Sequence, residues 1–264
     1  MPAGSGLGRL CDHGVVRVGL LHPGEMGAAI GAVLVEQGHE VLWRPQGRSP
    51  ETARRAAAAG LTGVDDFDDA EVILSVCPPH AALDVARSLT STSALVIDAN
   101  AVSPMTATQI GELIGERWVD GGIVGPPPHR EGTTRLYLSG AHATQASLLF
   151  EGTRLEPVIL TASPVAASAL KMAYAAWTKG SAALLLAALG SARSNGIEEA
   201  LRAEWSRSQP GLDARWQGAA DAAAEKGWRW VGEMNEIAAT FAAVGLPSGF
   251  HEAAAEMFER AAET

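Results

Sequence analysis

The sequence has few cysteines and fewer basic than acidic residues, and each shortage excludes a class of protein. Its 264 residues include two cysteines, Cys11 and Cys77, too few and too far apart to suggest a disulfide framework or a metal site. A reducing cytoplasm therefore fits the chain. Lys and Arg number 20 against 30 Asp and Glu, a formal charge of −10. Such a chain gives no electrostatic support for binding nucleic acid or an anionic membrane.

The sequence also lacks a long, uninterrupted apolar run. Its most apolar window, 165–189, is rich in alanine and is interrupted by Lys171 and Lys179, which predicts a buried helix rather than a membrane span. Residues 1–15 are rich in glycine and have no long apolar core, so they are not a secretory signal. We expect residues 1–15 to be a disordered leader outside the fold.

What the sequence does contain is an apolar run that stops at a glycine-containing turn and resumes as a helix of small residues. The stretch from Val16 to Gly27 reads VRVGLLHPGEMG. In a dinucleotide-binding turn, Gly24 would let the backbone approach a pyrophosphate, and Gly27 would let the helix pack on the sheet. His22 stands where the first glycine of this fingerprint is usual. Residues 38–43 then predict the second strand of a βαβ unit.

The rest of the chain divides into two parts by the type of element that it predicts. Strand-like runs alternate with helical segments as far as Thr161, and beyond Ser163-Pro164 only helical, alanine-rich sequence follows. The predicted strands are 16–21, 40–43, 72–76, 95–99, 118–120, 136–139 and 158–160. We therefore predict an α/β fold, with a Rossmann-like doubly wound sheet over 16–163 followed by an all-helical domain over 164–264.

Four features of the sequence carry a family resemblance: the turn 23–27, the loop 75–79 (SVCPP), the loop 98–104 (DANAVSP) and Lys171, early on a helix between domains. Together they resemble the β-hydroxyacid dehydrogenases, within the larger group related to 6-phosphogluconate dehydrogenase and imine reductases. The segments 47–49, 120–127 and 232–237 resemble a poorly characterised branch of this group with a compact helical C-terminal domain. The resemblance implies a Rossmann domain for a nicotinamide cofactor and a helical domain that closes the cleft, often in a homodimer.

Cofactor-binding residues are predicted from the turn, from the end of the second strand and from the two resembling loops. They are His22, Pro23, Gly24, Glu25, Met26, Arg44, Arg48, Ser49, Cys77, Pro78, Pro79 and Asn100. The second strand ends in Arg44 rather than in an acidic residue, and Arg48 and Ser49 follow. Guanidinium groups beside a hydroxyl suit a 2′-phosphate, so NADP(H) is predicted over NAD(H). The alternative is that both arginines are ordinary solvated charges of a loop.

Lys171 is the predicted catalytic residue. It is a single ammonium group in an otherwise apolar stretch, 166–177, and an amine among apolar side chains loses its proton more easily. Such a lysine can give a proton to a carbonyl oxygen or remove one from a hydroxyl. Tyr174 and Thr178 follow three and seven residues later on the same helical face. The alternative is a lysine that extends to the surface and has no chemical role.

The predicted substrate site departs from the family pattern. Ala175 stands where the family has an asparagine, Val124 where it has a serine, and Pro126 where it has a glycine, so a simple short hydroxy acid is a doubtful substrate. Residues that could line the site are Ser103, Val124, Gly125, Tyr174, Thr178 and Glu233. Glu233 could face an amine-bearing substrate or be a solvated carboxylate. His129 and Arg130 could bind an anionic substrate or be ordinary surface residues.

These observations predict an NADPH-dependent oxidoreductase that transfers hydride between nicotinamide and a carbonyl or hydroxyl carbon of a small substrate. Reduction of an imine is one alternative, and a catalytically silent NADP-binding or regulatory protein is the other. We predict no metal, no nucleic acid and no membrane as partners, a homodimer formed through the helical domain, and a cytoplasmic location.

Overall fold

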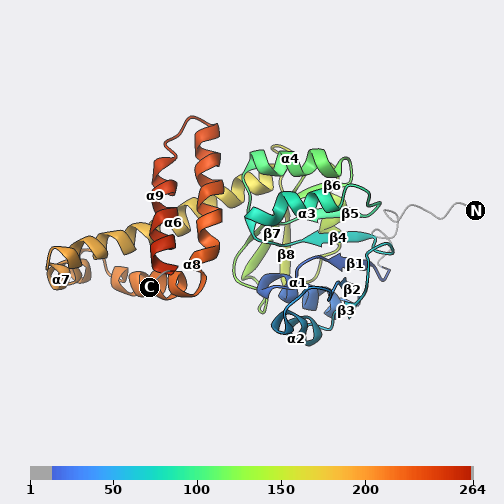
Figure 1. Ribbon diagram of the computed structural model, residues 1–264, viewed down its shortest axis with the longest axis horizontal. Helices are drawn as coiled ribbons and strands as arrows, with labels where there is room; N and C mark the ends of the chain where they lie inside the picture. The colour runs from blue at the N-terminus through green and yellow to red at the C-terminus, as the bar shows by residue number, and fades with distance from the viewer. Residues whose placement is uncertain (1–13, 263–264) are drawn as a thin grey trace, which may run out of the picture. The chain divides into compact units, whose positions relative to one another are not determined.

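The computed structural model describes residues 14–262 and divides into two compact units, one ending at Lys171 and one beginning at Met172 (Figure 1). The predicted leader therefore lies mostly outside the described residues. The predicted domain boundary at 163 falls eight residues before this division, because the division runs through helix α6 (Ala166–Ser194) rather than in front of it.

The first unit contains a sheet of eight strands in the order β3-β2-β1-β4-β5-β6-β7-β8. The strands are β1 (Arg17–Leu20), β2 (Glu40–Trp43), β3 (Thr62–Gly63), β4 (Val72–Ser75), β5 (Leu95–Asp98), β6 (Trp118–Val124), β7 (Thr134–Ser139) and β8 (Leu155–Ile159). Neighbouring strands are parallel except β6 and β7, which are antiparallel. The strand order reverses at β1, between β2 and β4, which is where doubly wound sheets bind ligands at the carboxyl ends of their strands.

Helices cover both faces of this sheet, as the predicted doubly wound fold requires. They are α1 (Glu25–Glu36), α2 (Pro50–Ala58), η2 (Pro79–Ala81), α3 (Ala82–Ser88), α4 (Pro104–Ile114) and α5 (Ala143–Leu148). Successive residues of β4 and β5 belong to opposite cores: Leu74 and Ile97 pack with α1, α2 and α5, whereas Ile73 and Val96 belong to the core on the other face. The predicted α/β fold with a helical C-terminal region is confirmed.

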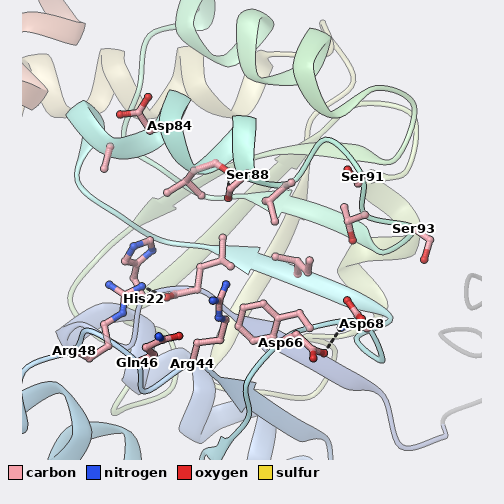
Figure 2. Close-up of a pocket in the computed structure, with 17 residues that line it drawn as sticks. His22, Arg44, Gln46, Arg48, Asp66, Asp68, Asp84, Ser88, Ser91 and Ser93 are labelled. Atoms are coloured by element: carbon pink, nitrogen blue, oxygen red, sulfur yellow. Dashed lines mark hydrogen bonds between the residues drawn. The ribbon is translucent and has the colours of Figure 1, made fainter.

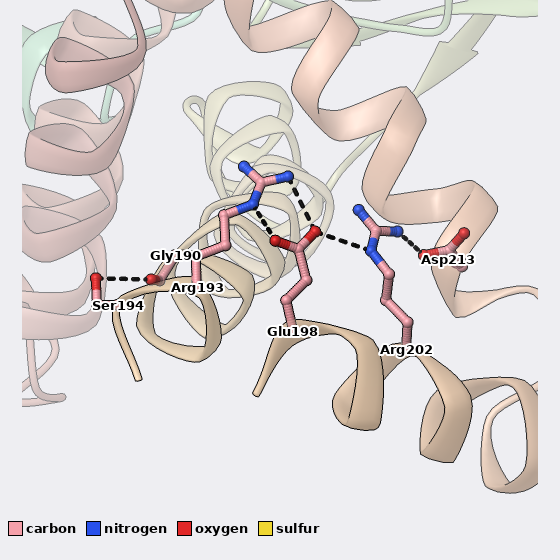
Figure 3. Close-up of polar contacts among 6 residues, drawn as sticks. All are labelled: Gly190, Arg193, Ser194, Glu198, Arg202 and Asp213. Atoms are coloured by element: carbon pink, nitrogen blue, oxygen red, sulfur yellow. Dashed lines mark hydrogen bonds and ion pairs between the residues drawn. The ribbon is translucent and has the colours of Figure 1, made fainter. Parts of the chain in front are cut away.

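The second unit is helical over its described residues. The remainder of α6 is followed by α7 (Glu198–Ser208), α8 (Leu212–Ala243) and α9 (Gly249–Ala262). Trp230 and Phe258 join α8 to α9 with ring centroids 4.9 Å apart. Figure 3 shows the chain of ion pairs that joins α6, α7 and α8, in which Glu198 accepts from Arg193 and Arg202, and Arg202 also pairs with Asp213.

Helix α6 is less buried than the sequence predicts. Its 29 residues are long and apolar enough to cross a membrane by length and composition, a test that core helices of soluble proteins also pass, and 22% of its most apolar window is buried. The expectation of a buried helix is therefore wrong over much of its length. The reason is that one stripe of α6 packs inward, while Trp177 and Leu184 are each 69% exposed.

Candidate functional site

The turn after β1 has the backbone geometry that a dinucleotide fingerprint requires. A Cβ at Gly27 would lie 2.2 Å from the carbonyl oxygen of His22, so only glycine fits there. A Cβ at Gly24 would meet no atom within 4 Å, so the space beside this residue is open to a ligand. Gly24 is the N-cap of α1 and supplies no side-chain cap to the helix. The helix thus presents backbone N–H groups and its positive dipole end next to an open backbone.

A pocket of about 820 Å³ lies beside this turn, and the two predicted arginines line it (Figure 2). His22, Arg44, Gln46 and Arg48 form one wall, at the ends of β1 and β2. Residues of the loop before β4 and of α3 form the others, including Asp66, Asp84 and Ser88. A cationic wall beside a glycine turn fits a phosphate group, and the pocket volume lies in the range of small-molecule sites.

The imidazole of His22 is neutral at physiological pH. Burial first and the nearby Arg48 guanidinium second lower its pKa to about 4. Its Nδ1 is buried and meets no hydrogen-bond partner among the described residues. His22 therefore adds polarity but no charge to the pocket wall, and the positive charge there belongs to Arg44 and Arg48.

The remaining residues of the turn region are structural neighbours of the pocket. Arg48 donates from Nη2 to the Leu21 carbonyl at 3.0 Å. Ser49 does not line the pocket; its hydroxyl is the N-cap of α2 and accepts from the Thr52 backbone N–H at 3.2 Å. The Pro23 carbonyl accepts from Arg55 at 3.3 Å. Glu25 and Met26 form the first turn of α1, where Met26 packs against the core.

The loops after β4 and β5 are joined through Asn100. The Asn100 Oδ1 accepts from the Cys77 backbone N–H at 2.6 Å, while its Nδ2 donates to the Ser75 hydroxyl at 3.0 Å and also to Asp98. Asn100 is 2% exposed. Burial and the charge of Asp98 raise the pKa of the Cys77 thiol to about 12, so the thiol stays protonated. Pro78 and Pro79 follow as the start of η2.

The carboxylate of Asp120 in β6 fixes the beginning of α6. It accepts from the Ser168 backbone N–H at 2.9 Å, from the Ser168 hydroxyl at 2.5 Å and from the Ser139 hydroxyl at 2.8 Å. Burial raises the pKa of Asp120, and these hydrogen bonds oppose that rise. Asp98 and Asp120 are register partners in adjacent parallel strands. Burial, followed by the charge of Asp120, raises the pKa of Asp98 to about 8.

Lys171 lies against the same strand. A Cβ at Gly122 would come within 3.1 Å of the Lys171 Cβ and 2.7 Å of the Ala167 carbonyl oxygen, so α6 packs directly on the backbone of β6. The side chain of Lys171 is half-buried. Lys171 thus belongs to the sheet unit. It lies beside Gly122, which is two residues further along β6 than Asp120, the register partner of Asp98.

The predicted substrate residues are spread over both units. Ser103 is the N-cap of α4, with its hydroxyl accepting from Thr106 N at 3.2 Å, and Val124 is buried at the end of β6. Gly125 has φ +123°, and a Cβ there would lie 2.2 Å from the Thr133 carbonyl oxygen, so the β6–β7 turn requires glycine. His129 and Arg130 are exposed.

In the second unit, Tyr174 is 48% exposed, and Thr178 donates to the Tyr174 carbonyl at 3.2 Å. Glu233 forms a buried ion pair with Lys179, whose ammonium lies 5.6 Å from the Trp230 ring centroid. The Glu233 carboxylate is therefore not solvated, and it is directed at Lys179 rather than into an open cavity.

The sequence did not reveal the residues that support the site without lining it. Asp120, Ser139 and Ser168 lie on three different elements, and no spacing in the sequence predicts that they meet. Arg55 likewise reaches the turn from α2. Gly122 could have been noticed, because two adjacent glycines inside a strand often mark a close backbone approach.

Comparison with known proteins agrees with this arrangement. Residues 17–102 match the family model described as "NADP oxidoreductase coenzyme F420-dependent", and residues 192–261 match "Domain of unknown function (DUF1932)". The chain is 27% identical to the conserved protein MTH1747, whose structure is described as similar to 3-hydroxyacid dehydrogenases, with a TM-score of 0.70 and coverage of 94% of this chain and 97% of that one.

Two further structures share the fold at lower identity. A Mycobacterium tuberculosis 3-hydroxyisobutyrate dehydrogenase with L-serine is 18% identical, with a TM-score of 0.72 over 95% of this chain and 94% of that one. A reductive aminase from Aspergillus terreus in complex with NADPH is 17% identical, with a TM-score of 0.58 over 95% and 94%. These two structures show the shared fold. The resemblance to this group of oxidoreductases, stated from the sequence, is confirmed by the match to MTH1747 and by the family model over residues 17–102.

Proposed function

We propose that this protein, an NADP(H)-dependent oxidoreductase of the group that includes the 3-hydroxyacid dehydrogenases, acts on a carbonyl or hydroxyl carbon and uses Lys171 to transfer the proton. The observation that supports this most directly is the packing of α6 on β6. It places the Cβ of Lys171 beside Gly122, close to the strand ends that a dinucleotide occupies in this fold.

The residues present fit a phosphorylated nicotinamide cofactor. The open backbone at Gly24 and the first turn of α1, which has no side-chain cap, suit the pyrophosphate, and the arginine wall of the pocket suits a 2′-phosphate. Asn100 and the Cys77 backbone form a second contact region after β4 and β5. When bound, such a cofactor supplies or accepts the hydride. The protein positions both partners and supplies the proton.

The role of Lys171 follows from its surroundings. Its helix begins on a buried polar network and its Cβ rests on a strand backbone, so the first part of the side chain has little freedom. An ammonium group held in this way can protonate a carbonyl oxygen as that carbon is reduced, and the neutral amine can take the proton back in the reverse direction.

The first experiment measures NADPH consumption with a panel of aldehydes, semialdehydes, keto acids and cyclic imines, for the parent protein and for Lys171→Ala. Loss of a general acid lowers kcat by about 10²–10⁴-fold, and cofactor binding should persist. Lys226→Ala is the matched control, because Lys226 lies in α8 and pairs with the neighbouring Glu225 at 3.7 Å. Carbonyl turnover that survives Lys171→Ala unchanged would remove the assignment.

The same panel decides between the alternatives. Reduction of imines alone would favour imine chemistry, for which the exposed Tyr174, one helical turn after Lys171, offers a phenol. Tight NADPH binding without turnover of any compound would favour a silent binding protein, the alternative that the departures at His22, Val124 and Ala175 keep open.

A second experiment tests the preference for the phosphorylated cofactor. Arg44→Asp with Arg48→Ala removes both cations of the pocket wall and adds a carboxylate, which repels a 2′-phosphate and can bind a ribose hydroxyl. We expect NADPH affinity to fall by about ten- to hundredfold and NADH affinity to hold or rise, measured by fluorescence titration. Arg54→Ala, an exposed position of α2 outside the pocket, is the control for lost charge. An unchanged preference would refute the phosphate contact.

We also propose a homodimer formed through the helical unit and a cytoplasmic location. The exposed aromatic and aliphatic side chains of that unit support self-association.

A further inference from the structure

We propose that Asp120 is a positioning residue for Lys171: its carboxylate caps the first turn of α6 from strand β6 and thereby fixes where the lysine side chain begins. This inference rests on the proposed function, in which Lys171 transfers the proton.

Helix α6 lacks a cap of its own. It begins at Ala166, and the preceding residue, Val165, has no side-chain oxygen to accept from the first free N–H groups. Strand residues supply the missing acceptors. The Ser168 N–H donates to Asp120 Oδ2 at 2.9 Å, and the Ala167 N–H donates to the Ser139 hydroxyl at 3.0 Å. These are the second and third N–H groups of the helix, the ones that an N-cap side chain normally satisfies.

The cap also fixes the rotation of the helix. The Asp120 carboxylate accepts from the Ser168 hydroxyl at 2.5 Å as well as from its backbone N–H, so two hydrogen bonds join it to one residue of the helix. The Ser139 hydroxyl on β7 bonds to the same carboxylate at 2.8 Å, which ties the cap to a second strand. Lys171 is three residues after Ser168 and therefore lies on the same side of the helix, one turn further on.

Gly122 provides the second point of contact. Asp120 and Gly122 are two residues apart in β6, so they share one face of the strand. A Cβ at Gly122 would press against the Ala167 carbonyl and the Lys171 Cβ at 2.7 and 3.1 Å. The helix is thus held at its start by the Asp120 carboxylate and rests at Lys171 on a strand residue without a side chain.

Of the two buried carboxylates at this level of the sheet, Asp120 is the one placed to hold the negative charge. It accepts three hydrogen bonds and faces the positive end of a helix, which stabilises the ionised form. Asp98 Oδ2 meets no partner among the described residues, and the Asp98 pKa near 8 leaves that group protonated at neutral pH. The negative charge that stabilises the first turn of α6 is therefore that of Asp120 in β6.

The test uses the fact that the chain has three lysines, Lys171, Lys179 and Lys226. Reductive ¹³C-methylation gives each amine its own NMR signal, so Lys171 is observed without a substrate. In Asp120→Asn, an amide replaces one acceptor oxygen. We expect the Lys171 signal to shift, and its response to added NADPH to weaken, while the Lys179 and Lys226 signals keep their positions. Asp98→Asn, which alters the register partner but no bond to α6, should leave the Lys171 signal of the cofactor-free protein in place.

Kinetics give a second readout. Asp120→Asn should lower kcat by about tenfold to a hundredfold, the effect of a small misplacement of a catalytic group, with the dissociation constant of NADPH within about twofold of the parent. A residue needed only for the fold would weaken cofactor binding in parallel. A Lys171 signal and a kcat that both stay at parent values in Asp120→Asn would overturn the inference.

Gly122→Ala covers the case in which Asp120→Asn does not fold. Its added methyl group must displace the backbone of α6, so we expect the same Lys171 shift and the same loss of kcat. Gly190→Ala is the matched control, because a Cβ at Gly190, also in α6, meets no atom within 4 Å. Unchanged Lys171 signals in Gly122→Ala would likewise refute the inference.

Failure of the proposed function gives a different result. Turnover that survives Lys171→Ala removes the proton-transfer role, while the NMR shifts still report whether Asp120 and Gly122 fix the lysine.

Discussion

At the scale of single residues, two carboxylates with similar burial differ in the number of hydrogen bonds that oppose the rise of their pKa on burial. Asp98 and Asp120 are 3% and 0% exposed and face each other in register. Two ionised carboxylates in one buried site repel each other, so one of them keeps a proton. Asp98 has the pKa raised to about 8, by burial first and by the Asp120 charge second.

This assignment predicts how stability depends on pH. The unfolded chain releases the Asp98 proton near pH 3.9, and the folded chain keeps it to about pH 8, so the folded state holds the extra proton between these values. Stability from this group is therefore complete at low pH and declines as pH rises towards 8. Asn cannot ionise, so Asp98→Asn should lose less stability on going from pH 6 to pH 9.

The measurement is the change in Tm between pH 6 and pH 9. We expect the parent Tm to fall by at least about 2 °C more than that of Asp98→Asn, the effect of roughly 1 kcal/mol. Asp84→Asn serves as the control, because the Asp84 side chain is 80% exposed and should leave the parent profile unaltered. Equal falls in the parent and in Asp98→Asn would show that Asp98 is ionised in the fold at pH 6.

The sequence predicted the residues that carry a motif and missed those that support them. Lys171 stands out in the sequence because it is a single ammonium group in an apolar helix, and its catalytic role stays a prediction; Gly27 stands out because its spacing from the strand is typical of the fingerprint. Asp120 stood in a stretch that resembled the family but had no role assigned. Its partners Ser139 and Ser168 are 19 and 48 residues away, and only the folded chain brings them together.

At the scale of elements, patterns of apolar residues predicted seven of the strands, and local chemistry explains what they missed. β3 has two exposed residues, Thr62 and Gly63, and thus no apolar pattern. β6 continues to Val124, beyond the predicted end at 120, through Gly121 and Gly122, which weaken any strand pattern. Close packing requires glycine at both positions. A Cβ at Gly121 would lie 3.0 Å from the Asp98 carbonyl oxygen, and a Cβ at Gly122 would press against α6.

Helix α6 shows why domain boundaries are harder to predict than elements. The strand signals stop near 163 and α6 begins at Ala166, yet the first turn of that helix is bonded to the sheet through Asp120 and Ser139. Side chains that cross from strand to helix therefore decide to which unit the first residues of α6 belong. The sequence also did not predict that β7 runs antiparallel to β6, because a strand pattern does not indicate the direction of the strand in the sheet.

At the scale of the whole molecule, the first unit contains the glycine turn, the arginine wall, the Asn100 loop and Lys171. The second unit, considered by itself, exposes large apolar side chains. Trp177 and Leu184 on α6 are both 69% exposed and seven residues apart, hence on one helical face, and Phe250 on α9 is 74% exposed. Side chains of this size left in water favour association.

The occupant that suits the α6 face is a second copy of the same chain. Two molecules with a charge of −10 repel each other over most of their surface, but α6 contains no acidic residue in its 29 positions. A helix face without carboxylates is where two such copies approach at the lowest electrostatic cost. We therefore expect a homodimer in which α6 contributes to the interface.

Sedimentation velocity at micromolar concentrations tests this expectation with Trp177→Glu combined with Leu184→Glu. The parent should sediment as a dimer and the variant as a monomer, because the variant adds like charges and removes apolar area at the same face. Val15→Glu, at a 66% exposed position of the first unit, adds one such charge elsewhere and should remain dimeric. A monomeric parent would refute the dimer, and a dimeric variant would move the interface away from α6.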